Sequence, residues 1–99
     1  MTNWTTIENV ESVASPGLLV DPAQVAENLD AMLAIVERDA TRLRPHVKTH
    51  KMPQLIQLQL EAGITKFKAA TIAEANMVAK AGGPDVLLSY QMVGPNVGR

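Results

Sequence analysis

The sequence contains no cysteine and very few aromatic residues, with one tryptophan, one tyrosine and one phenylalanine among 99 residues. The missing thiols exclude a disulfide framework, a thiolate metal site and a cysteine nucleophile, and we expect a protein of the reducing cytoplasm. The scarcity of aromatic rings excludes the interleaving of basic and stacking side chains that is typical of nucleic-acid binding. Nucleic acid is therefore not an expected partner.

The sequence also lacks a strong charge imbalance and a long apolar run. Its formal net charge is −1 and its pI is about 6.1, so no general electrostatic attraction to nucleic acid or anionic lipid is expected. The longest apolar run, Ala31–Val36, is far shorter than the roughly 20 residues that span a bilayer. The first residues lack the basic and apolar regions of a secretory signal. We expect a soluble, unexported protein with no membrane partner.

What is present is an alternation of short apolar runs with amphipathic segments. Apolar runs bounded by turn residues predict strands, and segments with helical periodicity after a capping residue or a proline predict helices. The expected order is a strand at 17–20, a helix at 22–39, a strand at 43–47, a helix from 53 to a stop at 63, a strand at 66–70, a helix from a capping box at 71 to 81, and a strand at 86–90. Residues 1–16 are expected to form a separate lead-in.

This alternation predicts an α/β fold in which parallel strands are joined by crossovers and covered by helices. In such folds, whether the sheet is open or closed into a barrel, the loops at the carboxyl ends of the strands carry the chemistry. Lys48, Thr71 and Tyr90 are each expected at or near such an end. We therefore predict that these three residues belong to a common site.

The densest group of chemically active side chains is the octapeptide Arg44–Lys51, which reads RPHVKTHK. A lysine that ends a buried strand among other cations loses its proton more easily, because desolvation and like-charge repulsion both disfavour the ammonium form. A neutral amine can then form a Schiff base, which makes Lys48 the candidate reactive group. The competing interpretation is a solvated basic turn without chemistry.

Other interpretations of the octapeptide concern its histidines and its charge. His46 and His50 have the i, i+4 spacing of two zinc ligands on a helix, but Pro45 disfavours a helix here. Histidines that orient their neighbours by hydrogen bonds are favoured instead. The cations could also hold the phosphate of a cofactor. Tyr90 fits a cofactor or substrate contact and a partly buried core residue equally well.

The segment Leu43–Met52 resembles the lysine motif of the D-threonine aldolase and D-serine dehydratase family, which are pyridoxal-phosphate enzymes of the alanine-racemase-like fold type. The likeness continues through GI at 63–64, KFKAATIAEA at 66–75, DVLL at 85–88 and VGP at 93–95, and SPGLLV at 15–20 resembles the family's opening strand. The resemblance implies the N-terminal portion of a (β/α)8 TIM-type barrel, to which the full-length family adds a C-terminal β-domain. Residues 17–99 are then its first βα units, because a barrel takes about 250 residues.

In this family the first lysine of the motif binds the cofactor covalently, and the resemblance assigns that catalytic role to Lys48. We predict His46, Thr71 and Tyr90 as further cofactor contacts. The implied cofactor is pyridoxal 5′-phosphate, the implied substrate is a small D-amino acid, and the full-length protein is expected to be a homodimer. A divalent metal (Mn, Mg or Zn) is implied for the full-length family, but its histidine and cysteine ligands are not in this sequence, so no metal ligand is assigned.

The activity that the resemblance implies is retro-aldol cleavage of a D-3-hydroxy amino acid to glycine and an aldehyde, with the cofactor as electron sink. Dehydration, as in D-serine dehydratase, and racemisation on the same fold are the alternatives. An alternative of another class is a non-catalytic α/β module that binds a phosphate-bearing ligand. The 99 residues alone are expected to be inactive, because they cannot enclose a cofactor unaided.

Overall fold

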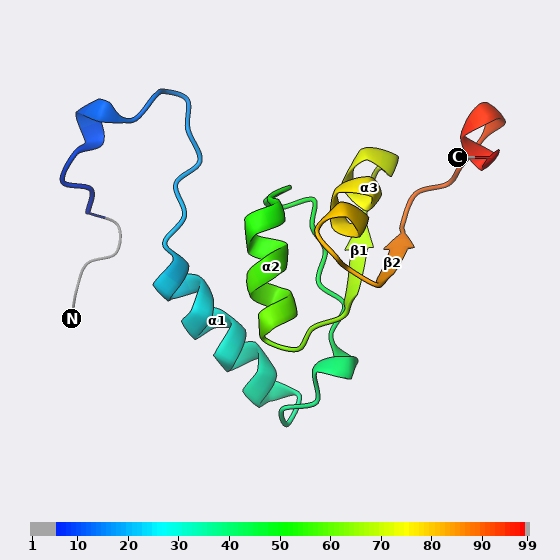
Figure 1. Cartoon of the computed structure of the whole chain (residues 1–99), viewed down its shortest axis with the longest axis horizontal. Coiled ribbons are helices and arrows are strands. Elements are labelled where there is room, and N and C mark those ends of the chain that lie inside the picture. Colours follow the sequence, from blue (N-terminus) through cyan, green and yellow to red (C-terminus); the bar gives the residue numbers. More distant parts are fainter. Residues whose placement is uncertain (1–5, 99) are drawn as a thin grey trace.

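The computed structural model describes residues 6–98 and shows two parallel strands with three helices (Figure 1). In chain order these are α1 (Pro22–Ile35), α2 (Pro53–Glu61), β1 (Lys66–Ala69), α3 (Ile72–Lys80) and β2 (Asp85–Leu88), with short 3-10 turns at Val10–Ser12, Ala40–Arg42 and Gly94–Gly98. The register pairs Lys66 with Asp85 and Ala69 with Leu88. The helix α3 connects the two strands, which confirms the predicted α/β fold with parallel strands.

A third parallel segment lies along the other edge of β1, but only as a single bridge between His46 and Lys68. The Val47 N–H donates to the Lys68 carbonyl and the Lys68 N–H donates to the Pro45 carbonyl, both at 2.9 Å. Extending this ladder backwards would require the N–H of residue 45 to donate to the carbonyl of Lys66, and proline has no N–H. The predicted strand at 43–47 is therefore shortened.

The forward extension of the same ladder is also blocked. It would pair the Ala70 N–H with the Val47 carbonyl, but this N–H has another acceptor and the carbonyl already accepts a local bond. The Ala70 N–H donates to Glu74 Oε1 at 3.0 Å, and the Val47 carbonyl accepts the Lys51 N–H at 2.9 Å. Local hydrogen bonds thus compete with the sheet and end it after one bridge.

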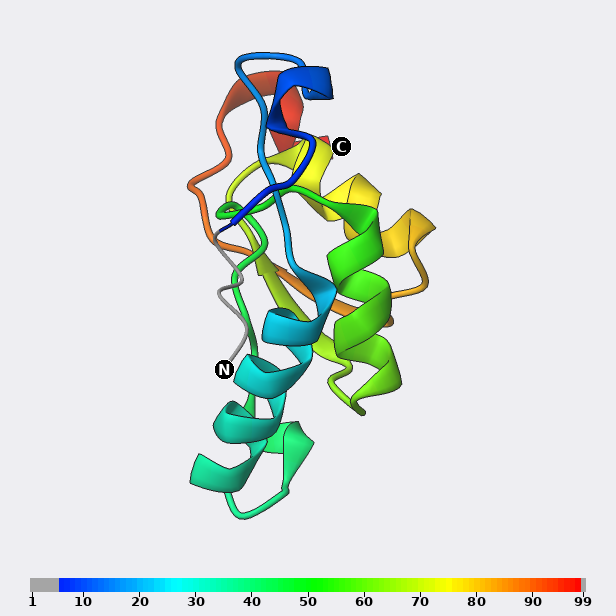
Figure 2. The same ribbon diagram turned by 90° about the vertical axis from the view of Figure 1, so that its left-hand side faces the viewer.

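The hydrophobic core lies on one face of this small sheet. Its fully buried side chains alternate along the parallel segments, with Val47, Phe67 and Ala69 all at 0% exposure. The helices cover this face, and the buried core residues are Leu29, Val47, Ile56, Ile64, Phe67, Ala69 and Val78. Figures 1 and 2 show α1 beside α2, so α1 forms the outer layer, and α2 and α3 lie nearer the strands.

The predicted buried strand at 17–20 is wrong. Leu18 and Leu19 are 67% and 53% exposed, and the segment forms no strand. A strand requires a neighbour that accepts and donates its backbone hydrogen bonds. Within residues 6–98 no other segment pairs with it, and Figure 1 shows the chain before α1 running away from the sheet.

The first helix starts as predicted and ends earlier than predicted. The Asp21 carboxylate caps its first turn by accepting two backbone N–H groups. The helix ends at Ile35 rather than Asp39, because Glu37 and Arg38 adopt left-handed φ angles of 57° and 64°. Left-handed residues cannot continue a right-handed helix, so the chain turns away toward the second 3-10 turn.

The molecule is extended for its length. Its radius of gyration is 15.9 Å, against about 13 Å for a compact domain of 100 residues. The segments before α1 and after β2 project from the body in Figure 1, which accounts for the difference. In the part that the structure describes, no helix has the length and apolar character needed to cross a membrane.

Candidate functional site

The three parallel segments end at the same level, which defines a rim at their carboxyl ends. Lys48 follows the bridged His46 by two residues, as Ala70 follows the bridged Lys68. On the other side of β1, the Ser89 N–H still donates to the last carbonyl of that strand at 2.8 Å. Lys48, Ala70 and Ser89 therefore occupy equivalent positions, and the predicted gathering of strand ends is present in the structure.

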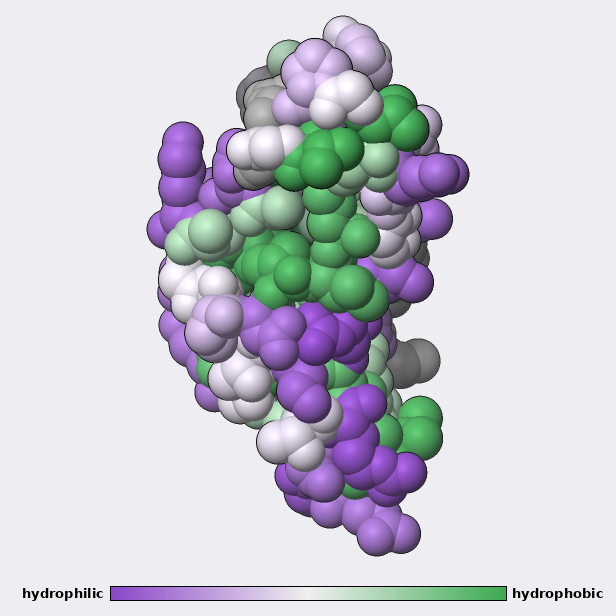
Figure 3. Space-filling model, turned by 90° about the vertical axis from the view of Figure 1, so that its right-hand side faces the viewer, coloured by the Kyte–Doolittle hydropathy of each residue, from purple (hydrophilic) through white to green (hydrophobic). Residues whose placement is uncertain are grey.

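The sheet face opposite the core is polar and open. Residues that are paired in register share a face, so this side carries Arg44, His46, Lys66, Lys68, Asp85 and Leu87, none of which is buried. Figure 3, which views the molecule from the β2 side, shows a hydrophobic zone above a hydrophilic one. The exposed large hydrophobic residues of β2 and the segment after it are Leu87, Tyr90, Val93 and Val97.

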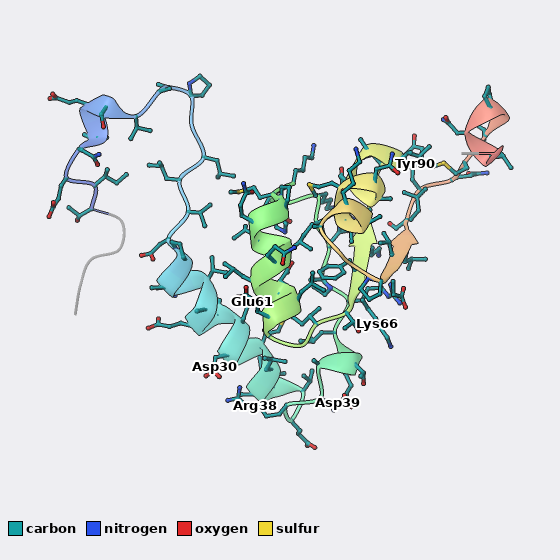
Figure 4. The ribbon with its side chains drawn as sticks, in the orientation of Figure 1. Asp30, Arg38, Asp39, Glu61, Lys66 and Tyr90 are labelled. Carbon is teal, nitrogen blue, oxygen red and sulfur yellow. The ribbon has the colours of Figure 1, made fainter. Side chains whose placement is uncertain are left out.

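Charged side chains at the amino end of the open face all have partners. Arg44 Nη1 donates to Asp85 Oδ1 at 2.7 Å and to the Phe67 carbonyl at 2.9 Å. The hydrogen bond from the guanidinium lowers the pKa of Asp85 below its ordinary value. The Lys66 ammonium donates to the Thr41 carbonyl at 3.1 Å. In Figure 4, Lys66 lies at this end and Tyr90 at the opposite one.

Cations at the carboxyl end of the open face are, by contrast, unpaired. Across residues 6–98, the ammonium groups of Lys48 and Lys68 have neither a hydrogen-bond acceptor nor an acidic partner. Lys48 is exposed and Lys68 is half-buried. This end of the face therefore offers two cationic donors to an anion or a carbonyl compound. The enclosure expected around Lys48 is not provided by the described residues.

Lys48 lies in a tight turn between the bridged segment and α2. The Lys51 N–H donates back to the Val47 carbonyl at 2.9 Å, and Lys51 has a left-handed φ of 53°. The Lys48 N–H donates to His46 Nδ1 at 3.1 Å. His46 thus orients the backbone of Lys48, as predicted for a histidine that positions its neighbour, while its contact with a cofactor stays a prediction.

His50, which the sequence interpretation did not include among the site residues, closes the same turn. Its Nδ1 accepts the Met52 N–H at 2.8 Å. Its Nε2 is buried and has no hydrogen-bond partner in the described part of the chain. Burial lowers the pKa of His50, because it disfavours the imidazolium. The sequence feature that indicates this role is the same spacing at both histidines: each lies two residues before the residue whose N–H it accepts.

The predicted residues Thr71 and Tyr90 line one pocket of about 410 Å³ at the rim, together with Ala70, Ile72, Met92 and Asn96. Tyr90 is 67% exposed and lies beyond the end of β2, which stops at Leu88 rather than Tyr90. This pocket does not include Lys48 or His46. Thr71 and Tyr90 thus share a pocket at the end of the sheet where Lys48 lies, but the structure does not bring all four predicted residues into one pocket.

Thr71 also serves the fold directly. Its hydroxyl accepts the Glu74 N–H at 3.1 Å, which is the first bond of the predicted capping box, and donates to Glu74 Oε2 at 3.2 Å, while the return bond of Glu74 goes to the Ala70 N–H rather than to the Thr71 N–H. Glu74 is only 6% exposed and its other carboxylate oxygen accepts the Ala70 N–H. The single hydroxyl proton of Thr71 is thus committed to the helix cap, and a cofactor contact by this residue stays a prediction.

Comparison with known proteins identifies the relatives of this chain. The alanine racemase, N-terminal domain, family matches residues 20–96. The chain belongs to the alanine racemase N-terminal domain family. Domains of this family form part of a TIM barrel, which agrees with the parallel strands and confirms the fold class predicted from the sequence. No solved structure matches the chain significantly.

Two curated proteins resemble the chain. It is 37% identical over 83 residues to "D-threonine aldolase" of Arthrobacter sp, covering 84% of this chain and 22% of that protein. It is 31% identical over 78 residues to "D-threo-3-hydroxyaspartate dehydratase" of Delftia sp. (strain HT23), covering 79% of this chain and 20% of that protein. The chain therefore spans about a fifth of the length of these relatives, and both are lyases by name.

Proposed function

We propose that this chain carries the lysine-bearing part of a pyridoxal-phosphate-dependent lyase that acts on D-3-hydroxy amino acids. The observation that supports this most directly is the position of Lys48. Its unpaired amine stands at the carboxyl end of a parallel segment, in a turn whose backbone is held by hydrogen bonds. Catalytic groups of α/β barrels stand at such ends.

The residues present fit the chemistry of this cofactor. When bound, pyridoxal phosphate supplies an electron sink for carbanion chemistry at the α-carbon of an amino acid. Lys48 would supply the primary amine that holds the cofactor's carbonyl carbon. The Lys68 ammonium, two residues before the rim on the same face, would attract an anionic group of cofactor or substrate.

The substrate class follows from what the names of the relatives share. D-threonine and D-threo-3-hydroxyaspartate are both D-amino acids with a hydroxyl on the carbon next to the α-carbon. We favour the aldolase reaction, since the relative named for it is the more similar of the two, at 37% identity against 31%. Dehydration of the same substrate class is the second candidate, and the dehydratase relative is the observation that supports it.

Borohydride reduction tests the role of Lys48. The full-length protein is incubated with pyridoxal phosphate, reduced and digested, and the modified peptide is identified by mass spectrometry. We expect the label on Lys48, with at least a tenfold loss of labelling in Lys48→Ala. Lys51→Ala is the matched control, because Lys51 is an exposed lysine of the same turn. Labelling spread equally over Lys48 and Lys51 would contradict the proposal and favour a non-catalytic module that binds phosphate-bearing ligands.

A further inference from the structure

The turn that carries Lys48 is held by two imidazoles used in the same way. His46 Nδ1 accepts the Lys48 N–H at 3.1 Å, and His50 Nδ1 accepts the Met52 N–H at 2.8 Å. In each case the acceptor lies two residues before the donor, as in the turns that asparagine and aspartate form. One bond holds the start of the turn, at Lys48, and the other holds its end, where α2 begins.

The second of these bonds supplies a helix cap that α2 otherwise lacks. Met52 is the N-cap residue of α2 and its side chain makes no capping hydrogen bond. In a capping box a glutamate three residues on would accept the N-cap N–H, but that position in α2 is Leu55. His50 provides the acceptor from the preceding turn instead, so the imidazole connects the turn to the N-cap residue of the helix.

These contacts determine the protonation of His50. A nitrogen that accepts a hydrogen bond carries no proton, so neutral His50 must carry its proton on Nε2. That Nε2–H is buried and, within the described residues, has no acceptor. A buried donor without an acceptor is unfavourable. Hydrogen bonding at Nε2 therefore does not explain why a histidine stands at this position. The hydrogen bond that Nδ1 accepts from the Met52 N–H does explain it.

We propose that His50 is a positioning residue for Lys48, acting through the hydrogen bond from the Met52 N–H to Nδ1. This inference rests on the proposed function for the link to the cofactor, but the geometry of the turn stands without it. Neutral His50 closes the turn onto α2, and the closed turn presents the Lys48 amine on the rim. The lowered pKa of His50 keeps the imidazole in the neutral form that can accept this bond.

Two amide substitutions separate the roles of the two ring nitrogens. In His50→Asn the side-chain oxygen replaces Nδ1 and can accept the Met52 N–H, whereas in His50→Gln the amide reaches the position of Nε2 and the Met52 N–H loses its acceptor. We expect hydrogen exchange at the Met52 amide to rise about five- to tenfold in His50→Gln and by less than about twofold in His50→Asn. Unchanged exchange in His50→Gln, or an equal rise in both variants, would overturn the proposal.

Nitrogen-15 NMR of the imidazoles in the unsubstituted chain gives an independent readout. We expect His50 as the Nε2–H tautomer, and an Nδ1–H tautomer or an imidazolium at neutral pH would overturn the assignment. In the full-length protein, labelling of Lys48 by pyridoxal phosphate and borohydride should fall about five- to tenfold in His50→Gln and be retained in His50→Asn. If the unsubstituted full-length protein is not labelled at Lys48, the proposed function fails, while the exchange and tautomer measurements still decide the role of His50.

Discussion

The two faces of the small parallel sheet are built by neighbouring residues of the same segments and have opposite properties. Val47, Phe67 and Ala69 are completely buried beneath the helices. Their immediate neighbours Lys48 and Lys68 lie on the other side, with unpaired ammonium groups. One face stabilises the fold and the other offers cations to a ligand. Because successive side chains of a strand point to opposite faces, residues that stabilise the core alternate with residues that are available to a ligand.

This separation means that substitutions on the two faces should have different consequences. Changes on the buried face should lower the free energy of unfolding, because they remove contacts or create overlaps. Changes on the open face should leave stability nearly unchanged and alter charge, ligand binding or pH dependence. The following predictions test this difference, from the largest expected effect to the smallest.

The largest effect is expected at Phe67, the largest fully buried side chain. Phe67→Ala should lower the free energy of unfolding by about 3–5 kcal/mol, because it removes buried apolar surface and leaves a cavity. Urea unfolding followed by far-UV circular dichroism measures this. The matched control on the open face is Leu87→Ala, since Leu87 is 50% exposed, and it should cost within about 0.5 kcal/mol. Equal losses in the two variants would show that the faces do not differ as described.

Most of the elements that build these faces were readable in the sequence. Apolar residues and helix starts predicted the order of α1, α2, β1, α3 and β2, and the caps at Asp21 and Thr71 are where the sequence placed them. These features depend on residues close together in the chain. Local hydrogen bonds and periodicity therefore sufficed to predict them.

Features that depend on distant partners were not predictable in the same way. The apolar segment 17–20 has the composition of a buried strand, but no described segment pairs with it. The bridge at His46 is short because Glu74, four residues beyond the Ala70 N–H, removes that donor from the ladder. An orienting hydrogen bond was predicted for His50, but its partner was not, since that depends on which ring nitrogen faces a backbone N–H.

A smaller effect is expected from overfilling the buried face at Gly83. A β-carbon there would lie closest to Val78 Cγ1, below ordinary contact, and would be 3.2 Å from Phe67 Cδ2. Val78 is fully buried and β-branched, so it cannot rotate away easily. Gly83→Ala should lower the free energy of unfolding by about 1–3 kcal/mol in urea unfolding. Gly98→Ala is the control, because nothing lies within 4 Å of its β-carbon, and a comparable loss there would contradict the packing argument.

The smallest effect is expected on the open face, at the ion pair of Arg44 with Asp85, and it should appear only as a dependence on pH. The hydrogen bond from Arg44 lowers the pKa of Asp85 in the folded chain, so the pair stabilises the fold above the unfolded-state pKa of about 3.9. This contribution disappears as the pH falls through the lower folded-state pKa. Asp85→Asn should therefore reduce the shift of the urea midpoint between about pH 6 and pH 3. Glu27→Gln, which changes an exposed carboxylate without a partner in residues 6–98, should leave that shift unchanged. If the two variants have the same pH profile, the ion pair does not contribute to stability.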